Sequence, residues 1–167
     1  MLDGEFLADG AGGALSFERR LGRPVEKIWA ALTIPERVAD WCGGRADVDL
    51  RIGGVFCIHW PKDMGVMNGV ITALDPPRLL EYSWHEPTVS VPASKVRWTL
   101  SPDGDGCTLK LEHIFTDVDR KSVTEFAGGW HDIINDVVRA SDGLAAAFNG
   151  VNHKALEAGY AEKFGER

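Results

Sequence analysis

Residues 122–148 read SVTEFAGGWHDIINDVVRASDGLAAAF, and the rest of the chain is best understood from this segment. Apolar side chains recur in it at three- and four-residue steps, which is the spacing of one face of an α-helix. At about 100° per residue they fall on a single arc of roughly 140°. The pattern therefore predicts one long amphipathic helix of about 26 residues. Its apolar face comprises Val123, Phe126, Ala127, Trp130, Ile133, Ile134, Val137, Val138, Ser141, Leu144, Ala145 and Phe148.

The ends and the polar face of this helix are also visible in the sequence. Ser122 followed by Glu125 fits a capping box, in which each side chain satisfies a backbone N–H of the first turn. Asn149-Gly150 supplies a stop, because both residues tolerate positive φ. A wide apolar face of this length needs a broad surface to cover. The residues expected on the opposite, outer face are Glu125, Asp132, Asp136 and Arg139.

The composition narrows the class of protein. With 167 residues, 44% of them hydrophobic and 26% charged, the chain is expected to form one soluble globular domain. The net charge of −7 argues against nucleic acid or anionic lipid as a partner, since both favour clustered Lys and Arg. No apolar run approaches the ~18 residues of a membrane span, and no signal peptide is apparent. We therefore expect a cytoplasmic protein without membrane insertion. Its three cysteines are odd in number and lack CxxC spacing, which predicts free thiols.

The chain before the long helix begins with a strand and two short helices. Residues 14–21 alternate as a strand does, and Gly22-Arg23-Pro24 ends it. Pro24 suits the first position of a helix, and the apolar stripe that follows predicts that helix up to Leu32. Thr33, with Glu36 three residues later, is expected to cap a second short helix, which reaches Trp41.

From residue 48 onward the hydrophobic period changes from helical to two. Apolar and polar residues alternate, and turns rich in Gly, Pro and Asp separate the segments, which is typical of hairpin-linked strands. Connections this short predict an antiparallel sheet with one apolar face, and only the long helix could cover that face. The fold class is therefore α+β, with a curved antiparallel sheet of about six to seven strands around the helix. The strands expected after the short helices span residues 48–52, 55–60, 66–74, 80–85, 95–100 and 107–115.

The two ends of the chain are expected to behave differently from the domain between them. Residues 1–13 are small, acidic and Gly-rich, which predicts a flexible arm, and residues 14–149 form the domain. In residues 150–167, Leu156, Tyr160 and Phe164 recur every four residues. This spacing predicts a helical extension of the same domain that docks on it, or else a contact with a second copy in a homodimer.

Several segments of the chain resemble a known family. The matching pieces are RPVEKIWAALTIPERVADW (23–41), GGVF (53–56), GVITALDPPRLLEYSW (69–84), CTLKLEHIF (107–115) and GGWHDIINDVV (128–138). They resemble the START-like, helix-grip (SRPBCC) superfamily, and within it the group named after the activator of the 90-kDa heat-shock protein ATPase. The resemblance implies a helix-grip fold with a cavity between sheet and long helix. Relatives use that cavity for lipids, polyketides and other apolar molecules. Some relatives are cyclases or hydrolases, and the name-giving member is a co-chaperone.

The candidate ligand-binding residues follow from the predicted faces. Rigid aromatic walls suit recognition of an apolar or aromatic ligand, although the same side chains could simply fill the core. His113 alone interrupts the apolar face of its strand with a titratable group, so it is either satisfied structurally or offered to a ligand. The candidates are Trp60, Tyr82, Trp84, Trp98, His113, Trp130 and Ile134.

No cofactor, metal site or catalytic set is indicated by the sequence. The five histidines show no paired spacing suited to Zn²⁺, and no G-x-S-x-G, G-x-G-x-x-G or P-loop motif is present. The first hypothesis is therefore a protein that holds a hydrophobic small molecule. The alternatives are a polyketide cyclase or hydrolase that uses His113 with Tyr82 or Glu81, and a chaperone-associated protein that needs no pocket. A plain apolar cavity favours carriage, converging polar groups favour the enzyme, and a filled interior favours the partner protein.

Overall fold

The structure is a computed structural model and describes residues 1–147 and 150–165. It confirms the α+β helix-grip class: a six-stranded antiparallel sheet in the order β1-β2-β9-β8-β7-β6 carries a long helix on one face, and a three-stranded sheet in the order β3-β4-β5 lies apart from it. No helix formed by these residues is long and apolar enough to cross a membrane. The elements are β1 (Glu5–Asp9), β2 (Gly12–Leu21), α1 (Val25–Thr33), α2 (Pro35–Cys42), β3 (Arg45–Val48), β4 (Phe56–His59), β5 (Val66–Met67), β6 (Ile71–Asp75), β7 (Leu79–Trp84), β8 (Ser94–Asp103), β9 (Gly106–Phe115), α3 (Arg120–Ser141) and α4 (Gly150–Phe164).

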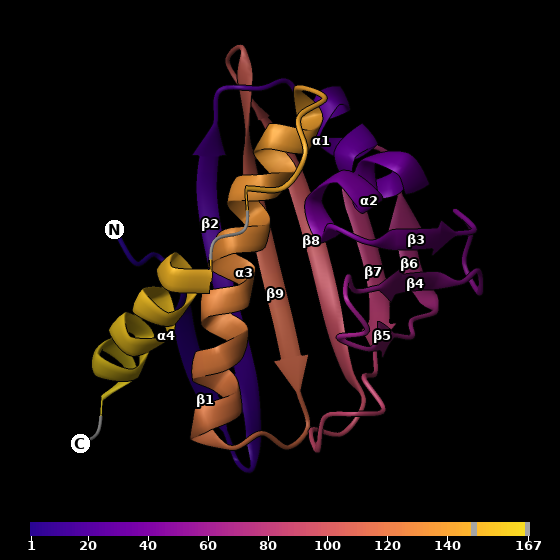
Figure 1. Cartoon of the computed structure of the whole chain (residues 1–167). Coiled ribbons are helices and arrows are strands. Elements are labelled where there is room, and N and C mark those ends of the chain that lie inside the picture. Colours follow the sequence, from indigo (N-terminus) through magenta and orange to yellow (C-terminus); the bar gives the residue numbers. More distant parts are fainter. Residues whose placement is uncertain (148–149, 166–167) are drawn as a thin grey trace.

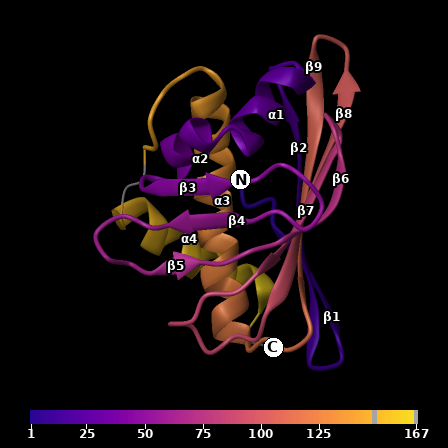
Figure 2. The same cartoon turned by 90° about the vertical axis from the view of Figure 1, so that its right-hand side faces the viewer.

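All the helices and the small sheet lie on the same side of the large sheet. Figure 1 shows α3 running along β2, β9 and β8, with α1 and α2 near its C-terminal end and α4 crossing its outer side. In Figure 2 the large sheet is seen nearly edge-on, and the small sheet stands beside α3 on the helical side. The small sheet and α2 therefore lie on one flank of α3, on the helical side of the large sheet.

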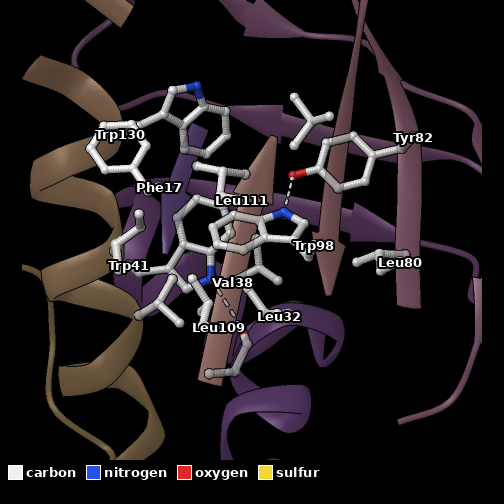
Figure 3. Packing of buried hydrophobic residues seen from close by; sticks show 14 of the residues in the cluster. Phe17, Leu32, Val38, Trp41, Leu80, Tyr82, Trp98, Leu109, Leu111 and Trp130 are labelled. Atoms are coloured by element: carbon white, nitrogen blue, oxygen red, sulfur yellow. Dashed lines mark hydrogen bonds between the residues drawn. The ribbon is translucent and has the colours of Figure 1, made fainter. Parts of the chain in front are cut away.

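The core forms where the period-two strands meet α3. Alternate residues of β7, β8 and β9 point toward the helix, as predicted, and Trp98 packs edge-on against Trp130 of α3 with ring centroids 5.6 Å apart. Figure 3 shows this contact and the hydrogen bond from Trp98 Nε1 to the Tyr82 hydroxyl, 3.0 Å long. The buried residues of these strands and of α3 include Leu80, Tyr82, Trp84, Val96, Trp98, Leu100, Leu109, Leu111, Phe115, Ala127, Trp130, Ile134 and Val137.

Helix α3 is shifted and shorter than predicted. Its N-cap is Asp119, whose side chain accepts a hydrogen bond from Ser122 N, so the expected Ser122–Glu125 capping box does not form. The helix ends at Ser141, because the chain turns at Asp142 and takes a positive φ of 76° at Gly143. The periodic apolar residues after that point do not continue it. The predicted end at Phe148, and Asn149 of the predicted stop, lie outside the described residues, and Gly150 begins α4.

Asp136 does not lie on an outer face as predicted. Its side chain is buried because residues 142–147 fold back along α3 and cover it. Its Oδ1 accepts a hydrogen bond of 2.8 Å from Ala147 N, while Ala146 N donates to the carbonyl of Asp40 in α2. The return of the chain therefore joins α2 and α3.

The elements before the core differ from the prediction in two places. Thr33 does not cap α2: it is the last residue of α1, its hydroxyl donates to the Trp29 carbonyl, and Ile34 with Pro35 begins α2. The single strand expected over residues 66–74 is divided, because β5 pairs with β4 in the small sheet and β6 pairs with β7 in the large one. The chain crosses from one sheet to the other within residues 68–70.

The N-terminal segment is not a loose arm. Glu5–Asp9 form β1, which pairs with β2 at the edge of the large sheet. Helix α4 packs across α3, and its Tyr160 is buried against Phe17 of β2. Gly4 N donates a 3.0 Å hydrogen bond to the Tyr160 hydroxyl, so the two ends of the chain meet beneath α4.

Candidate functional site

A cavity of about 510 Å³ lies beside α3, on the side of α2 and the small sheet. It is walled by one face of α3, the C-terminal end of α2, the β4–β5 connection, the segment after β7, and α4. The face of α3 that meets the large sheet is filled by the core, so the cavity is displaced sideways from the position expected between sheet and helix. Its lining residues are Trp41, Cys42, Gly43, Trp60, Pro61, Lys62, Met64, Val66, Trp84, Glu86, Thr88, Val89, Ser122, Glu125, Phe126, Gly129, Trp130, Asp132, Ile133, Asp136, Ala146, His153 and Glu157.

Aromatic rings form the inner wall. Trp84 stands at the end of β7, with its ring centroid 5.1 Å from Trp130, 6.3 Å from Trp60 and 6.4 Å from Phe126. These distances lie in the range of favourable tilted and edge-on contacts, so the rings fix one another. A wall of mutually packed rings offers broad apolar surface with little side-chain entropy left to lose when a ligand binds.

One carboxyl group is held against this wall. Glu86 follows β7 on the loop, and its Oε1 accepts a 3.0 Å hydrogen bond from Trp60 Nε1. Burial raises the pKa of the Glu86 carboxyl above its usual range, since removing the group from water disfavours the ionised form.

Further acidic groups line the cavity on α3 and α4. His153 Nδ1 lies 2.9 Å from Asp132 Oδ2, a contact that joins α4 to α3. Within α4, His153 Nε2 lies 2.9 Å from Glu157 Oε1. Burial raises the pKa of Asp136 as well, and the hydrogen bond from Ala147 N opposes that rise.

The predicted site residues fall into two groups. Trp60, Trp84 and Trp130 line the cavity together. Ile134 is fully buried in the core on α3. Tyr82 and Trp98 are hydrogen-bonded to each other there, and burial raises the pKa of Tyr82. Neither Ile134 nor this pair is among the residues that line the cavity.

His113 belongs to the core group. Trp130 Nε1 donates a 3.0 Å hydrogen bond to His113 Nδ1, so Nδ1 carries no proton. The neutral ring therefore has its proton on Nε2, which lies 2.7 Å from the Ser94 hydroxyl and donates to it. Burial lowers the pKa of His113 to about 3. With both nitrogens satisfied inside the protein, the geometry favours the structural interpretation of this residue.

The acid–base pairs expected of an enzyme are not assembled around His113. Glu81 is buried on the outer side of β7, where Arg97 and Thr72 donate hydrogen bonds to it. These partners lower the pKa of the Glu81 carboxyl and offset the opposing effect of its burial. The Tyr82 hydroxyl is occupied by Trp98.

One polar atom of the aromatic wall has no partner. Trp84 Nε1 is buried, and no hydrogen-bond acceptor for it exists in the described parts of the chain. A buried donor without an acceptor costs roughly 1–3 kcal/mol, so such an atom calls for an explanation.

The sequence missed the cavity residues that lie in connections. Glu86, Met64 and Val89 sit in loops, where no periodicity identifies an inner face. The available signal was the pair of prolines that bounds the 87–92 loop, which marks this segment as a loop without assigning it to a site. Phe126 and Ile133 were placed correctly on the apolar face of the helix, but that face divides between the core and the cavity.

An antiparallel sheet that grips a long C-terminal helix, with a cavity beside the helix, defines a START-like (SRPBCC) protein. The family model described as "Activator of Hsp90 ATPase homolog 1-like protein" matches residues 23–140. The chain belongs to this family, as the resemblance in its sequence predicted.

Solved structures agree with this assignment. CalU16 from Micromonospora echinospora is 26% identical and superposes with a TM-score of 0.72, covering 94% of this chain and 95% of that one. Protein MLL2253 from Mesorhizobium loti is 27% identical with a TM-score of 0.70, covering 78% of this chain and 97% of that one. DynU16, a protein in the dynemicin biosynthetic locus, is 22% identical with a TM-score of 0.72 and covers 81% of this chain and 49% of that one, a likeness of fold alone. No curated protein matches the chain.

Proposed function

We propose that this protein binds a hydrophobic small molecule in the cavity beside α3. The observation that carries the proposal is the cavity itself: about 510 Å³ of space behind a wall of Trp60, Trp84, Trp130 and Phe126. Protein interiors are close-packed, and voids larger than a water molecule are few. Ligand pockets typically have about 300–1,000 Å³ and are lined mainly by apolar and aromatic side chains. A space of this size and lining has the properties of a binding site.

Two other functions receive less support. A chaperone-associated role of the kind that gives the family its name needs no cavity, and a filled interior would have favoured it. An enzyme that uses His113 with Tyr82 or Glu81 would need these side chains at the cavity, and none of the three lines it.

The proposal can be tested by filling the cavity from α3. Gly129 lies on the helix and lines the cavity, and a Cβ added there would find its nearest neighbour, His153 Cε1, at 4.0 Å. Gly129→Leu should therefore fold, because it relieves the cost of a glycine inside a helix and meets no backbone. Its side chain should occupy space that a ligand needs.

The measurement is the fluorescence of N-phenyl-1-naphthylamine, a neutral dye that brightens in apolar sites. The wild type should bind it, and Gly129→Leu should weaken binding at least about tenfold. Gly22→Leu is the matched control, since that position is open and is not among the residues that line the cavity. Equal binding by all three proteins would show that the dye does not use the cavity, and absence of binding to the wild type would count against a ligand-binding function.

A further inference from the structure

The charges that line the cavity are strongly unbalanced. Five of its described lining residues are carboxylic acids, namely Glu86, Glu125, Asp132, Asp136 and Glu157, while the basic lining residues are Lys62 and His153. Lys62 is exposed. Even a fully protonated His153, which lies between Asp132 and Glu157, leaves the acidic groups in excess. The net charge of −7 of the chain adds to the same field.

We infer that the cavity selects apolar ligands that carry a protonated amine, with the ammonium group beside Glu86 and the apolar body on the tryptophan wall. This inference rests on the proposed function, because it concerns the chemistry of the molecule bound in the same cavity. It excludes fatty acids and other anionic amphiphiles as preferred ligands.

Glu86 is the carboxylate best placed to hold such a group. Its hydrogen-bond partner is Trp60 Nε1, and among the described residues no Lys, Arg or His forms an ion pair with it. A carboxylate held in a partly buried position without a counter-charge carries a desolvation cost that a bound cation would offset. Its raised pKa has the same origin.

The aromatic wall favours the same chemistry. A cation within about 6 Å of a ring face is attracted by the negative face of the aromatic ring, and tryptophan gives the strongest such interaction. Trp60 and Trp84 have ring centroids 6.3 Å apart and an interplanar angle of 49°, so a small group can contact both. An anionic ligand would face repulsion both from these ring faces and from the acidic groups.

Trp84 supplies part of this apolar wall. Trp84 is 4% exposed, its indole nitrogen has no acceptor in the described residues, and its ring lines the cavity. The ligand class is thus an amine with an apolar, preferably aromatic body.

The test compares three molecules that share one body and differ in charge. Isothermal titration calorimetry at pH 7 would measure the binding of 2-naphthylmethylamine, 2-naphthylmethanol and 2-naphthoic acid. We expect the amine to bind at least about tenfold more tightly than the alcohol, and the acid to bind most weakly. Glu86→Gln should reduce the preference for the amine over the alcohol by threefold or more.

Glu112→Gln is the control, because it removes the same charge from the outer side of β9, where Glu112 pairs with Lys110. Asp132→Asn gives a second variant inside the cavity and should also reduce the preference for the amine. Equal loss in Glu112→Gln and Glu86→Gln would assign the effect to net charge and overturn the inference. An alcohol that binds as tightly as the amine would overturn it while leaving the binding function intact, whereas failure of the dye and of all three naphthyl compounds would overturn the binding function itself.

Discussion

Both ring nitrogens of His113 form hydrogen bonds inside the protein. It accepts a hydrogen bond from Trp130 and donates one to Ser94, so it joins α3, β8 and β9 through a single ring. Its neighbours Phe115 and Phe126 have ring centroids 4.1 Å and 4.8 Å away. A charged imidazolium would lose the bond from Trp130, because Nδ1 would then carry a proton. The ring therefore stabilises the fold only in its neutral form.

This arrangement predicts a loss of stability in mild acid. The pKa of His113 is about 3 in the folded protein and 6.5 ordinarily, so between these values the unfolded chain binds a proton that the folded chain excludes. The contribution of His113 is complete above pH 6.5 and declines as the pH falls toward 3. From pH 7 to pH 5 the free energy of unfolding should decrease by about 2 kcal/mol on account of this residue. Urea titrations at both pH values measure it.

His113→Gln provides the comparison, because glutamine can hydrogen-bond but does not titrate. The decrease between pH 7 and pH 5 should be about 2 kcal/mol smaller in the variant than in the wild type. The other histidines and the carboxylates are common to both proteins and cancel in this difference. The same decrease in both would mean that His113 is protonated in the folded state.

Asp136 was predicted on the outer face of α3 but is buried. Its replacement separates the effect of its hydrogen bond from the effect of its charge. Asp136→Ala removes the acceptor for Ala147 N–H and should lower the free energy of unfolding by about 1–3 kcal/mol. Asp136→Asn keeps an acceptor oxygen and removes the charge. Burial raises the pKa of this carboxyl, so the wild type loses stability as the pH rises through its titration. At pH 7 the Asn variant should equal or exceed the wild type in urea, and an Asn variant as unstable as Ala would contradict this account.

Helix α3 is the element on which both the core and the cavity are built. Ile134 and Val137 are fully buried on its sheet-facing side. Ile134→Ala should cost about 2–5 kcal/mol, and Val137→Ala somewhat less, because each leaves a space that rigid strands cannot close. Lys121→Ala, at an exposed position on the same helix, should stay within about 0.5 kcal/mol. Denaturant midpoints that placed Lys121→Ala among the costly variants would refute the assigned facing.

Helix α4 packs against α3 and contacts the N-terminal residues and β2 through Tyr160. The Tyr160 hydroxyl accepts from Gly4 N and lies 2.9 Å from His131 Nδ1, while its ring packs on Phe17. Tyr160→Phe keeps the ring and removes the hydroxyl, which leaves a buried N–H without a partner, so we expect a cost of about 1–3 kcal/mol. Amide hydrogen exchange in β1 should become faster in the variant. Unchanged exchange there would show that β1 is held by β2 alone.

For the molecule as a whole, the sequence predicted what depends on local periodicity. The alternation in β7, β8 and β9 and the three- to four-residue steps of α3 identified the right faces, because a residue spacing is a property of the element itself. The end of α3 was missed because Leu144 and Ala145 continue the apolar pattern beyond the turn at Gly143. The burial of Asp136 was missed because it depends on a segment that folds back from eleven residues away.

The candidate site was predicted only where it coincides with regular structure. Trp60, Trp84 and Trp130 were identified because they lie in phase with apolar strand or helix faces. Tyr82, Trp98 and His113 satisfy the same pattern equally well, and only their three-dimensional partners assign them to the core. Glu86 lies in a loop, where neither period applies, so its place against Trp60 could be seen only in the structure.

The division between a closed hydrogen-bonded core and a cavity walled in part by connecting segments has an evolutionary consequence. Under the proposed function, substitutions at Met64, Glu86 or Val89 would alter what the cavity accepts. They would leave intact the Trp98–Tyr82 and His113–Trp130 hydrogen bonds of the core. Ligand preference could therefore change during evolution while the fold is retained, since loops tolerate substitutions better than packed elements do. A lineage built on this plan can acquire new ligands by small steps, and sequence divergence among its members should concentrate in residues 60–66 and 86–92.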